Sequence, residues 1–298
     1  MIRLNWIAAV AHLAAFAVVL SLYLAWKRSR PHAIAQVFRP TLPEVWELGV
    51  GGCNSNPFSS STGKCTTSYA YAPPQKTFRF NIIVGVLIFF GFTVLAHVFY
   101  ATDAKGVYTA ALAAGWNPYR WIEYGISASL MSVLVGYSLG VRDGAQLLGL
   151  AVTTAAMQAN GFVVEGALKR AVLNLPVIVG ATASGWLAFV ALWLPILYNF
   201  GMLYLDVESK YKHEIDPDTG KRVQIPAWVW FIVVVQLLHY AGFGWVQLRQ
   251  VTRALGGTPQ QFMDVERKYV MLSLTAKLSL AGGLGYGLLY RTRDCPLN

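Results

Sequence analysis

Seven long runs of apolar residues, separated by polar segments, dominate the pattern along the chain. Each run holds at least 18 residues, and a helix that rises about 1.5 Å per residue needs roughly 20 residues to cross the hydrocarbon core of a bilayer. The predicted spans cover residues 2–26, 81–101, 117–141, 146–163, 176–205, 226–248 and 269–290. We see no internal repeat and no second domain. The pattern therefore predicts an all-α membrane protein, a seven-transmembrane-helix bundle that forms a single domain over residues 1–298.

The longest polar segment follows the first run and covers residues 27–78. A loop of this length usually has a function or structure of its own. Within it, residues 69–71 and 77–80 could pair as a short β-hairpin. Cys53 and Cys65 could form a disulfide if the loop faces an oxidising compartment, and otherwise they are two unpaired thiols. Their spacing does not match a metal site.

Composition and charge support the membrane class but give an ambiguous orientation. The chain is 55% hydrophobic and 13% charged, with a formal net charge of +10. The basic residues lie beside and between the apolar runs, which argues against a nucleic-acid-binding protein. Eight Lys and Arg residues lie on the N-terminal side of the predicted bundle and fourteen on the other side. The positive-inside rule would therefore place the N-terminus outside, although the counts become eight and seven without the long loop.

The last run carries one charged residue, Lys277, near its middle. A lysine at the centre of a membrane helix costs about 2.5–3.5 kcal/mol on insertion scales, so it needs a partner or a chemical role. An amine in an apolar pocket loses its proton easily and can form a Schiff base with an aldehyde. The alternative is a lysine that snorkels or pairs with a carboxylate for packing alone.

A buried protonated Schiff base needs a counter-ion, and Glu123 in the third run is the best candidate. Glu123, Ser127 and Met131 are spaced four apart and so share one helix face. Ser273 lies four residues before Lys277 and near the same side of the membrane. These residues can therefore converge at a similar depth. The alternative for Glu123 is a local ion pair with Arg120 at the start of the helix.

Two histidines, His97 and His12, lie inside the second and first runs. Histidine titrates near neutral pH, so one beside the counter-ion could take up a proton. The alternative is that each is only a hydrogen-bonded packing residue.

Large aromatic and methionine side chains in the other runs could enclose a flat apolar ligand. The sequence around Met157 adds polar and small residues at mid-membrane. The candidate pocket residues are Tyr124, Met157, Asn160, Trp186 and Tyr240. The alternative for the aromatic residues is ordinary helix packing.

The seven runs, the Ser273 and Lys277 pair, His97, and the stretch Arg-Trp-Ile-Glu-Tyr-Gly-Ile-Ser-Ala-Ser at positions 120–129 together resemble the heliorhodopsins, a rhodopsin-like family. The resemblance covers the whole layout of the chain, including the long first loop. It implies that Lys277 binds all-trans retinal, that Glu123 is the counter-ion, and that the N-terminus is cytoplasmic. The loop with both cysteines would then be extracellular. A homodimer is common in the family. The sixth run departs from the family because it lacks a phenylalanine-rich stretch.

The same resemblance bears on mechanism. Light-driven proton pumps of similar layout carry a carboxylate four residues before the lysine, where this chain has Ser273, and a second one eleven residues after the first carboxylate of the third helix, where it has Leu134. We therefore expect a photoreceptor with an unidentified signalling partner rather than an ion pump or an enzyme. One alternative is a light-gated proton channel, and another is a retinal-free receptor or transporter.

Overall fold

The computed structural model describes residues 1–29, 82–103, 105–141, 143–169, 175–211, 225, 227–254 and 259–294. Within these residues the chain forms eight helices and no strand, which confirms the all-α class. The helices are α1 (Ile2–Ser29), α3 (Ile82–Thr102), α4 (Val107–Ala113), α5 (Pro118–Ser138), α6 (Gly144–Lys169), α7 (Leu175–Tyr211), α8 (Ala227–Ala254) and α9 (Pro259–Asp294). Seven of them are long and correspond to the seven predicted runs. Cys53, Cys65 and the predicted hairpin at 69–71 and 77–80 lie outside the described residues.

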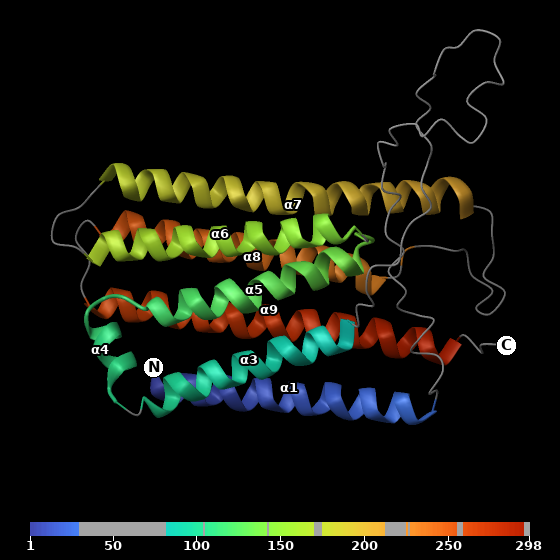
Figure 1. The fold of residues 1–298 in the computed structure, drawn as a ribbon, viewed down its shortest axis with the longest axis horizontal. Helices are drawn as coiled ribbons and strands as arrows, with labels where there is room; N and C mark the ends of the chain where they lie inside the picture. The colour runs from blue at the N-terminus through green and yellow to red at the C-terminus, as the bar shows by residue number, and fades with distance from the viewer. Residues whose placement is uncertain are drawn as a thin grey trace, which may run out of the picture.

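The seven long helices run side by side, with the short α4 across one end of the bundle (Figure 1). α5 packs against α3, α6, α8 and α9, and α9 also packs against α1 and α8. Hence α5 and α9 lie between the α1–α3 pair and the remaining helices (Figure 1). The two helices that carry Glu123 and Lys277 are therefore each packed against at least four other helices.

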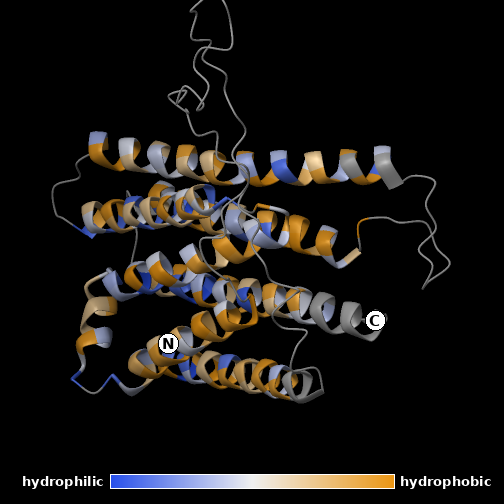
Figure 2. Ribbon diagram, turned by 45° about the vertical axis from the view of Figure 1, so that its right-hand side comes forward, coloured by the Kyte–Doolittle hydropathy of each residue, from blue (hydrophilic) through white to orange (hydrophobic). Residues whose placement is uncertain are grey.

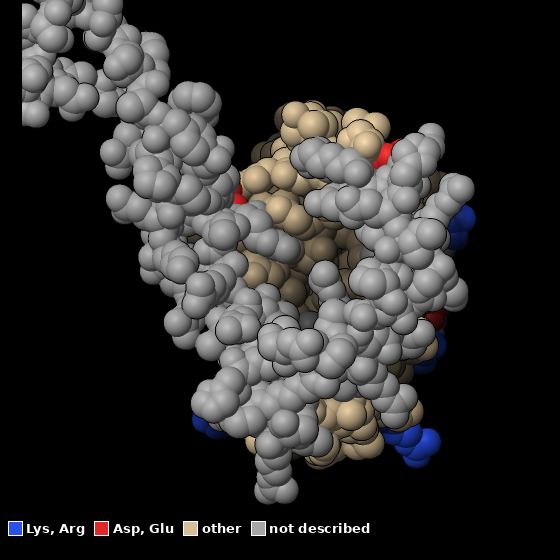
Figure 3. All heavy atoms as spheres, turned by 90° about the vertical axis from the view of Figure 1, so that its right-hand side faces the viewer, with Lys and Arg blue, Asp and Glu red and all other residues tan. Residues whose placement is uncertain are grey.

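Five of the long helices are long and apolar enough to cross a membrane, namely α1, α3, α6, α7 and α8. Hydrophobic residues recur along all the long helices (Figure 2), and the described side chains visible at the centre of the end view are neither acidic nor basic (Figure 3). Leu95, Leu187 and Leu238 are each at least 65% exposed, which suits contact with lipid chains. α5 and α9 are less apolar because they carry the buried charges, which a bilayer tolerates only inside the bundle.

Several helices extend beyond the predicted spans. α6 continues to Lys169 rather than 163, and α9 begins at Pro259, ten residues before the predicted start. The hydropathy pattern marks only the apolar part, whereas helical backbone hydrogen bonds continue into polar residues. α5 instead ends early, at Ser138, because the chain turns at Gly140 with a φ of +97°. The extra turns of α6 and α9 place two glutamates inside the bundle.

The short helix α4 was not predicted. It begins after Asp103, whose carboxylate accepts hydrogen bonds from the backbone N–H groups of Tyr108 (2.8 Å) and Thr109 (3.1 Å). The Tyr108 ring is buried and stacks on Tyr100 with 4.9 Å between ring centroids. Asn5 of α1 donates a hydrogen bond to the Tyr108 hydroxyl over 3.1 Å. α4 is thus fixed to the ends of α1 and α3.

Candidate functional site

Lys277 and Glu123 meet in the centre of the bundle. The Lys277 Nζ atom lies 2.5 Å from Glu123 Oε1, and the two residues are 2% and 3% exposed. Lys277 Nζ also donates to the Thr93 hydroxyl over 2.9 Å, and Thr93 donates to Glu123 Oε1 over 3.3 Å. α3, α5 and α9 therefore supply one residue each to a closed hydrogen-bonded triangle.

Three other residues that the sequence predicted for the site lie near this triangle. Ser127, one turn after Glu123, donates to Glu123 Oε1 over 2.8 Å. The Tyr124 ring centroid lies 5.5 Å from Lys277 Nζ. Ser273 is buried on α9, one turn before Lys277. Thr93 was not predicted as a site residue, although its position four residues before His97 places both on one face of α3.

The two histidines lie beside each other on α1 and α3. The His12 and His97 rings stack with 5.3 Å between centroids. His12 Nδ1 contacts the backbone carbonyl of Ala8 at 2.7 Å, and His97 Nδ1 contacts Asn5 Oδ1 at 2.9 Å. Because both oxygens only accept, each neutral ring carries its hydrogen on Nδ1 and a lone pair on Nε2. Both Nε2 atoms are buried without a partner among the described residues.

A second buried charge cluster joins α5, α6 and α9. The Arg120 guanidinium pairs with Glu165 of α6 and with Glu266 of α9, and all three residues are at most 2% exposed. The local Arg120–Glu123 ion pair considered from the sequence is therefore wrong, because Glu123 pairs with Lys277 instead. The sequence did not predict this cluster, because positions 165 and 266 lie outside the predicted apolar spans.

Residues at the start of α5 complete this cluster. Asn117 caps the helix by accepting from the Arg120 backbone N–H over 3.2 Å, as an Asn-Pro start predicts. Its own N–H donates to Glu165 over 2.5 Å, and its amide Nδ2 donates to Glu266 over 2.7 Å. The Arg120 guanidinium also lies 4.0 Å from the Tyr269 ring centroid. These contacts fix the first turn of α5 and with it the position of Glu123.

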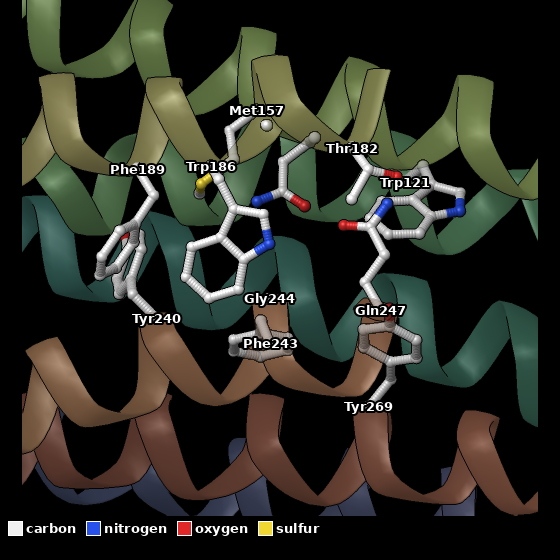
Figure 4. Close-up of a pocket in the computed structure, with 12 residues that line it drawn as sticks. Trp121, Met157, Thr182, Trp186, Phe189, Tyr240, Phe243, Gly244, Gln247 and Tyr269 are labelled. Carbon is white, nitrogen blue, oxygen red and sulfur yellow. The ribbon is translucent and has the colours of Figure 1, made fainter. Parts of the chain in front are cut away.

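A cavity of about 40 Å³ lies between α5, α6, α7, α8 and α9 (Figure 4). The residues that line it are Trp121, Met157, Gln158, Thr182, Gly185, Trp186, Phe189, Tyr240, Phe243, Gly244, Gln247 and Tyr269. Three of the predicted pocket residues, Met157, Trp186 and Tyr240, are among them. Met131 is buried in the same apolar core as Tyr240.

Asn160, a fourth predicted pocket residue, does not line the cavity. Its amide donates to Ser184 of α7 over 3.2 Å. A contact between Asn160 and a bound retinal therefore stays a prediction. The next residue does face inward, since a Cβ at Gly161 would lie 2.1 Å from the Trp121 ring.

Two glycines leave space for tryptophan rings that line the cavity. Gly161 has no Cβ and so leaves space for the indole of Trp121. A Cβ at Gly244 would lie 2.9 Å from the Trp186 ring, so this glycine likewise leaves space for an indole. Trp121 is held by a 3.1 Å hydrogen bond from its Nε1 to Glu165. On the other side, the ring centroids of Phe243 and Tyr124 are 5.5 Å apart. One aromatic ring, that of Tyr124, therefore connects the cavity to Lys277.

Comparison with known proteins gives one family. A family model described as Heliorhodopsin matches residues 55–287, more than half of the chain. No curated protein matches the chain. The matched range contains Lys277, Glu123 and His97 but not α1, so the placement of His12 and Asn5 rests on the geometry alone.

Proposed function

The chain belongs to the heliorhodopsin family, whose members are retinal-binding, light-sensing membrane proteins built on seven helices, and from this we propose that Lys277 carries all-trans retinal through a protonated Schiff base with Glu123 as its counter-ion. The observation that carries the proposal is the buried Lys277–Glu123 pair, 2.5 Å apart. A lysine amine enclosed by apolar residues is a nucleophile toward an aldehyde. The adjacent carboxylate stabilises positive charge on that nitrogen.

The residues around Lys277 suit a flat apolar polyene. Six of the twelve residues that line the cavity are aromatic, and Tyr124 and Phe243 connect it to the lysine. At about 40 Å³ the cavity is smaller than such a molecule, so binding requires some side chains that line it to change rotamer. Retinal, when bound, supplies absorption of visible light and a light-driven change of shape. Met157, Trp186, Phe189, Tyr240 and Phe243 would form its walls.

The polar residues next to Lys277 can hold a proton inside the bundle. Glu123 and Thr93 both contact Lys277 Nζ, and Thr93 lies one helical turn from His97. The lone pairs on His97 and His12 provide two further acceptors. Asn5 and the buried Tyr108 continue this polar chain to α4, at the end of the bundle where α5 begins.

This arrangement favours a photoreceptor over a pump. In the other half of α5, the position eleven residues after Glu123 is Leu134, fully buried and unable to supply a proton. Towards the start of α5, the Arg120 cluster lies between the Lys277 site and the end of the bundle. The proposed output of illumination is a change of shape that a signalling partner recognises, for which α4 is a suitable element.

Electrical recording separates the photoreceptor from the light-gated proton channel. We expect cells that express the protein with retinal to show no sustained photocurrent under voltage clamp, because the fully buried Leu134 cannot pass a proton on in the other half of α5. Lys277→Ala is the control for effects of light alone. A sustained current in the wild type that reverses with the proton gradient would replace the photoreceptor proposal with the channel.

We also propose, from family resemblance, that the N-terminus is cytoplasmic and that the protein forms a homodimer in the bilayer. The count of basic residues argues for the opposite orientation. However, long loops weaken the positive-inside rule, and most of the excess lies in the loop after α1.

A further inference from the structure

Three polar side chains from three different helices line the cavity. Gln158 comes from α6, Thr182 from α7 and Gln247 from α8, and Figure 4 shows Thr182 and Gln247 together at the end of the cavity beside Trp121. Gln158 is only 9% exposed. The Thr182 hydroxyl is fully enclosed and has no hydrogen-bond partner among the described residues. The side chains of Gln158 and Gln247 likewise make no hydrogen bond to the described part of the chain.

The buried, unpartnered Thr182 hydroxyl has no role in binding a purely apolar molecule. A polar group without a hydrogen-bond partner in a membrane interior is costly, and Leu or Val would line an apolar site at no such cost. The other end of the cavity is lined by Met157, Phe189 and Tyr240, and the Tyr240 hydroxyl is already satisfied by the carbonyl of Ala128 over 3.0 Å. Thr182 and Gln247 therefore lie at the end of the cavity away from these residues.

The rings of Tyr124 and Phe243 relate Lys277 to the polar end of the cavity. The Tyr124 ring centroid lies 5.5 Å from Lys277 Nζ, and the Phe243 ring centroid lies 5.5 Å from that of Tyr124. Gln247 follows Phe243 by one turn of α8, and Figure 4 shows Phe243 between Tyr240 and Gln247. A molecule anchored at Lys277 that passes Phe243 thus brings its far end to the three polar side chains.

We infer that Gln158, Thr182 and Gln247 form a subsite for a hydroxyl or keto oxygen on the ring of the bound retinal. The protein then prefers a ring-oxygenated retinal over the unsubstituted one. Amide and hydroxyl side chains both donate and accept, so together they satisfy either kind of oxygen. This inference rests on the proposed attachment of retinal to Lys277.

A competition experiment tests the preference. The purified full-length protein is equilibrated with equal amounts of all-trans retinal and its ring-hydroxylated form, using 3-hydroxyretinal and 4-hydroxyretinal in separate mixtures. Borohydride then fixes the bound aldehydes, and mass spectrometry measures the ratio of the two adducts on Lys277. One net hydrogen bond predicts about a two- to tenfold excess of a hydroxylated adduct.

Variants assign the preference to the subsite. The double variant Thr182→Val and Gln247→Leu is expected to form both adducts in nearly equal amounts. Thr252→Val, an exposed threonine further along α8, is the matched control and keeps the wild-type ratio. Equal adducts in the wild type with both hydroxylated forms, or an unchanged ratio in the double variant, would overturn the inference. If the double variant fails to fold, Thr182→Val alone and the wild-type ratio still decide it. An absence of any adduct on Lys277 would instead contradict the proposed function itself.

Discussion

Replacing Glu123 with glutamine is expected to shift the visible absorption of the retinal-loaded protein to longer wavelength, or to abolish it, at neutral pH. Glu123 is the carboxylate that contacts Lys277, at 2.5 Å. Two opposite charges about 4 Å apart attract by about 4 kcal/mol at an effective dielectric of about 20. Without this attraction the positive charge at Lys277 is less stabilised in the ground state, so the excitation energy falls or the nitrogen loses its proton. An absorption spectrum measures either result.

A second carboxylate serves as the control for this change. Asp264→Asn removes a charge that is 53% exposed near the start of α9, and its spectrum should match the wild type. If Glu123→Gln leaves the spectrum unchanged, another group is the counter-ion and the Lys277–Glu123 pair is only a packing contact.

Replacing Arg120 with methionine is expected to destabilise the protein by about 3–5 kcal/mol, the usual effect of removing one partner from a buried ion pair. The change leaves Glu165 and Glu266 facing each other without their shared guanidinium. It also removes the stacking on Tyr269. Thermal unfolding of the protein in detergent measures the effect, and most of the variant should be lost at temperatures that the wild type survives.

The matched control for this prediction is Arg267→Met. Arg267 is 55% exposed and pairs with Asp264 over 3.2 Å, and exposed ion pairs contribute only about 0.2–1 kcal/mol. Equal stability of the Arg120 and Arg267 variants would show that the buried cluster does not hold α5, α6 and α9 together.

The sequence predicted the seven long helices and the meeting of Lys277 with Glu123. Both predictions depend on constraints that a membrane imposes on the chain that crosses it. Apolar runs of sufficient length must be helices, since lipid cannot satisfy backbone polar groups. A lone charge inside such a run needs a partner at similar depth, and few carboxylates lie within the predicted runs.

The sequence did not predict the Arg120 cluster, α4 or the polar end of the cavity. Glu165 and Glu266 lie in parts of α6 and α9 that are too polar to be recognised as spans, so hydropathy assigned them to loops. α4 has only seven residues and is held by tertiary contacts of Tyr108. The sequence around Asn160 shows a polar, small-residue stretch but not that Gln158 is the polar residue of this stretch that lines the cavity.

We propose above all that Lys277 is the residue that carries retinal. The most direct measurement is peptide mass spectrometry of the retinal-loaded protein after borohydride reduction, with Lys277→Ala alongside. We predict a retinyl adduct on the peptide that contains Lys277, together with a visible absorption band before reduction, and neither in the variant. An adduct on a different lysine, or a visible band that persists in Lys277→Ala, would contradict the account.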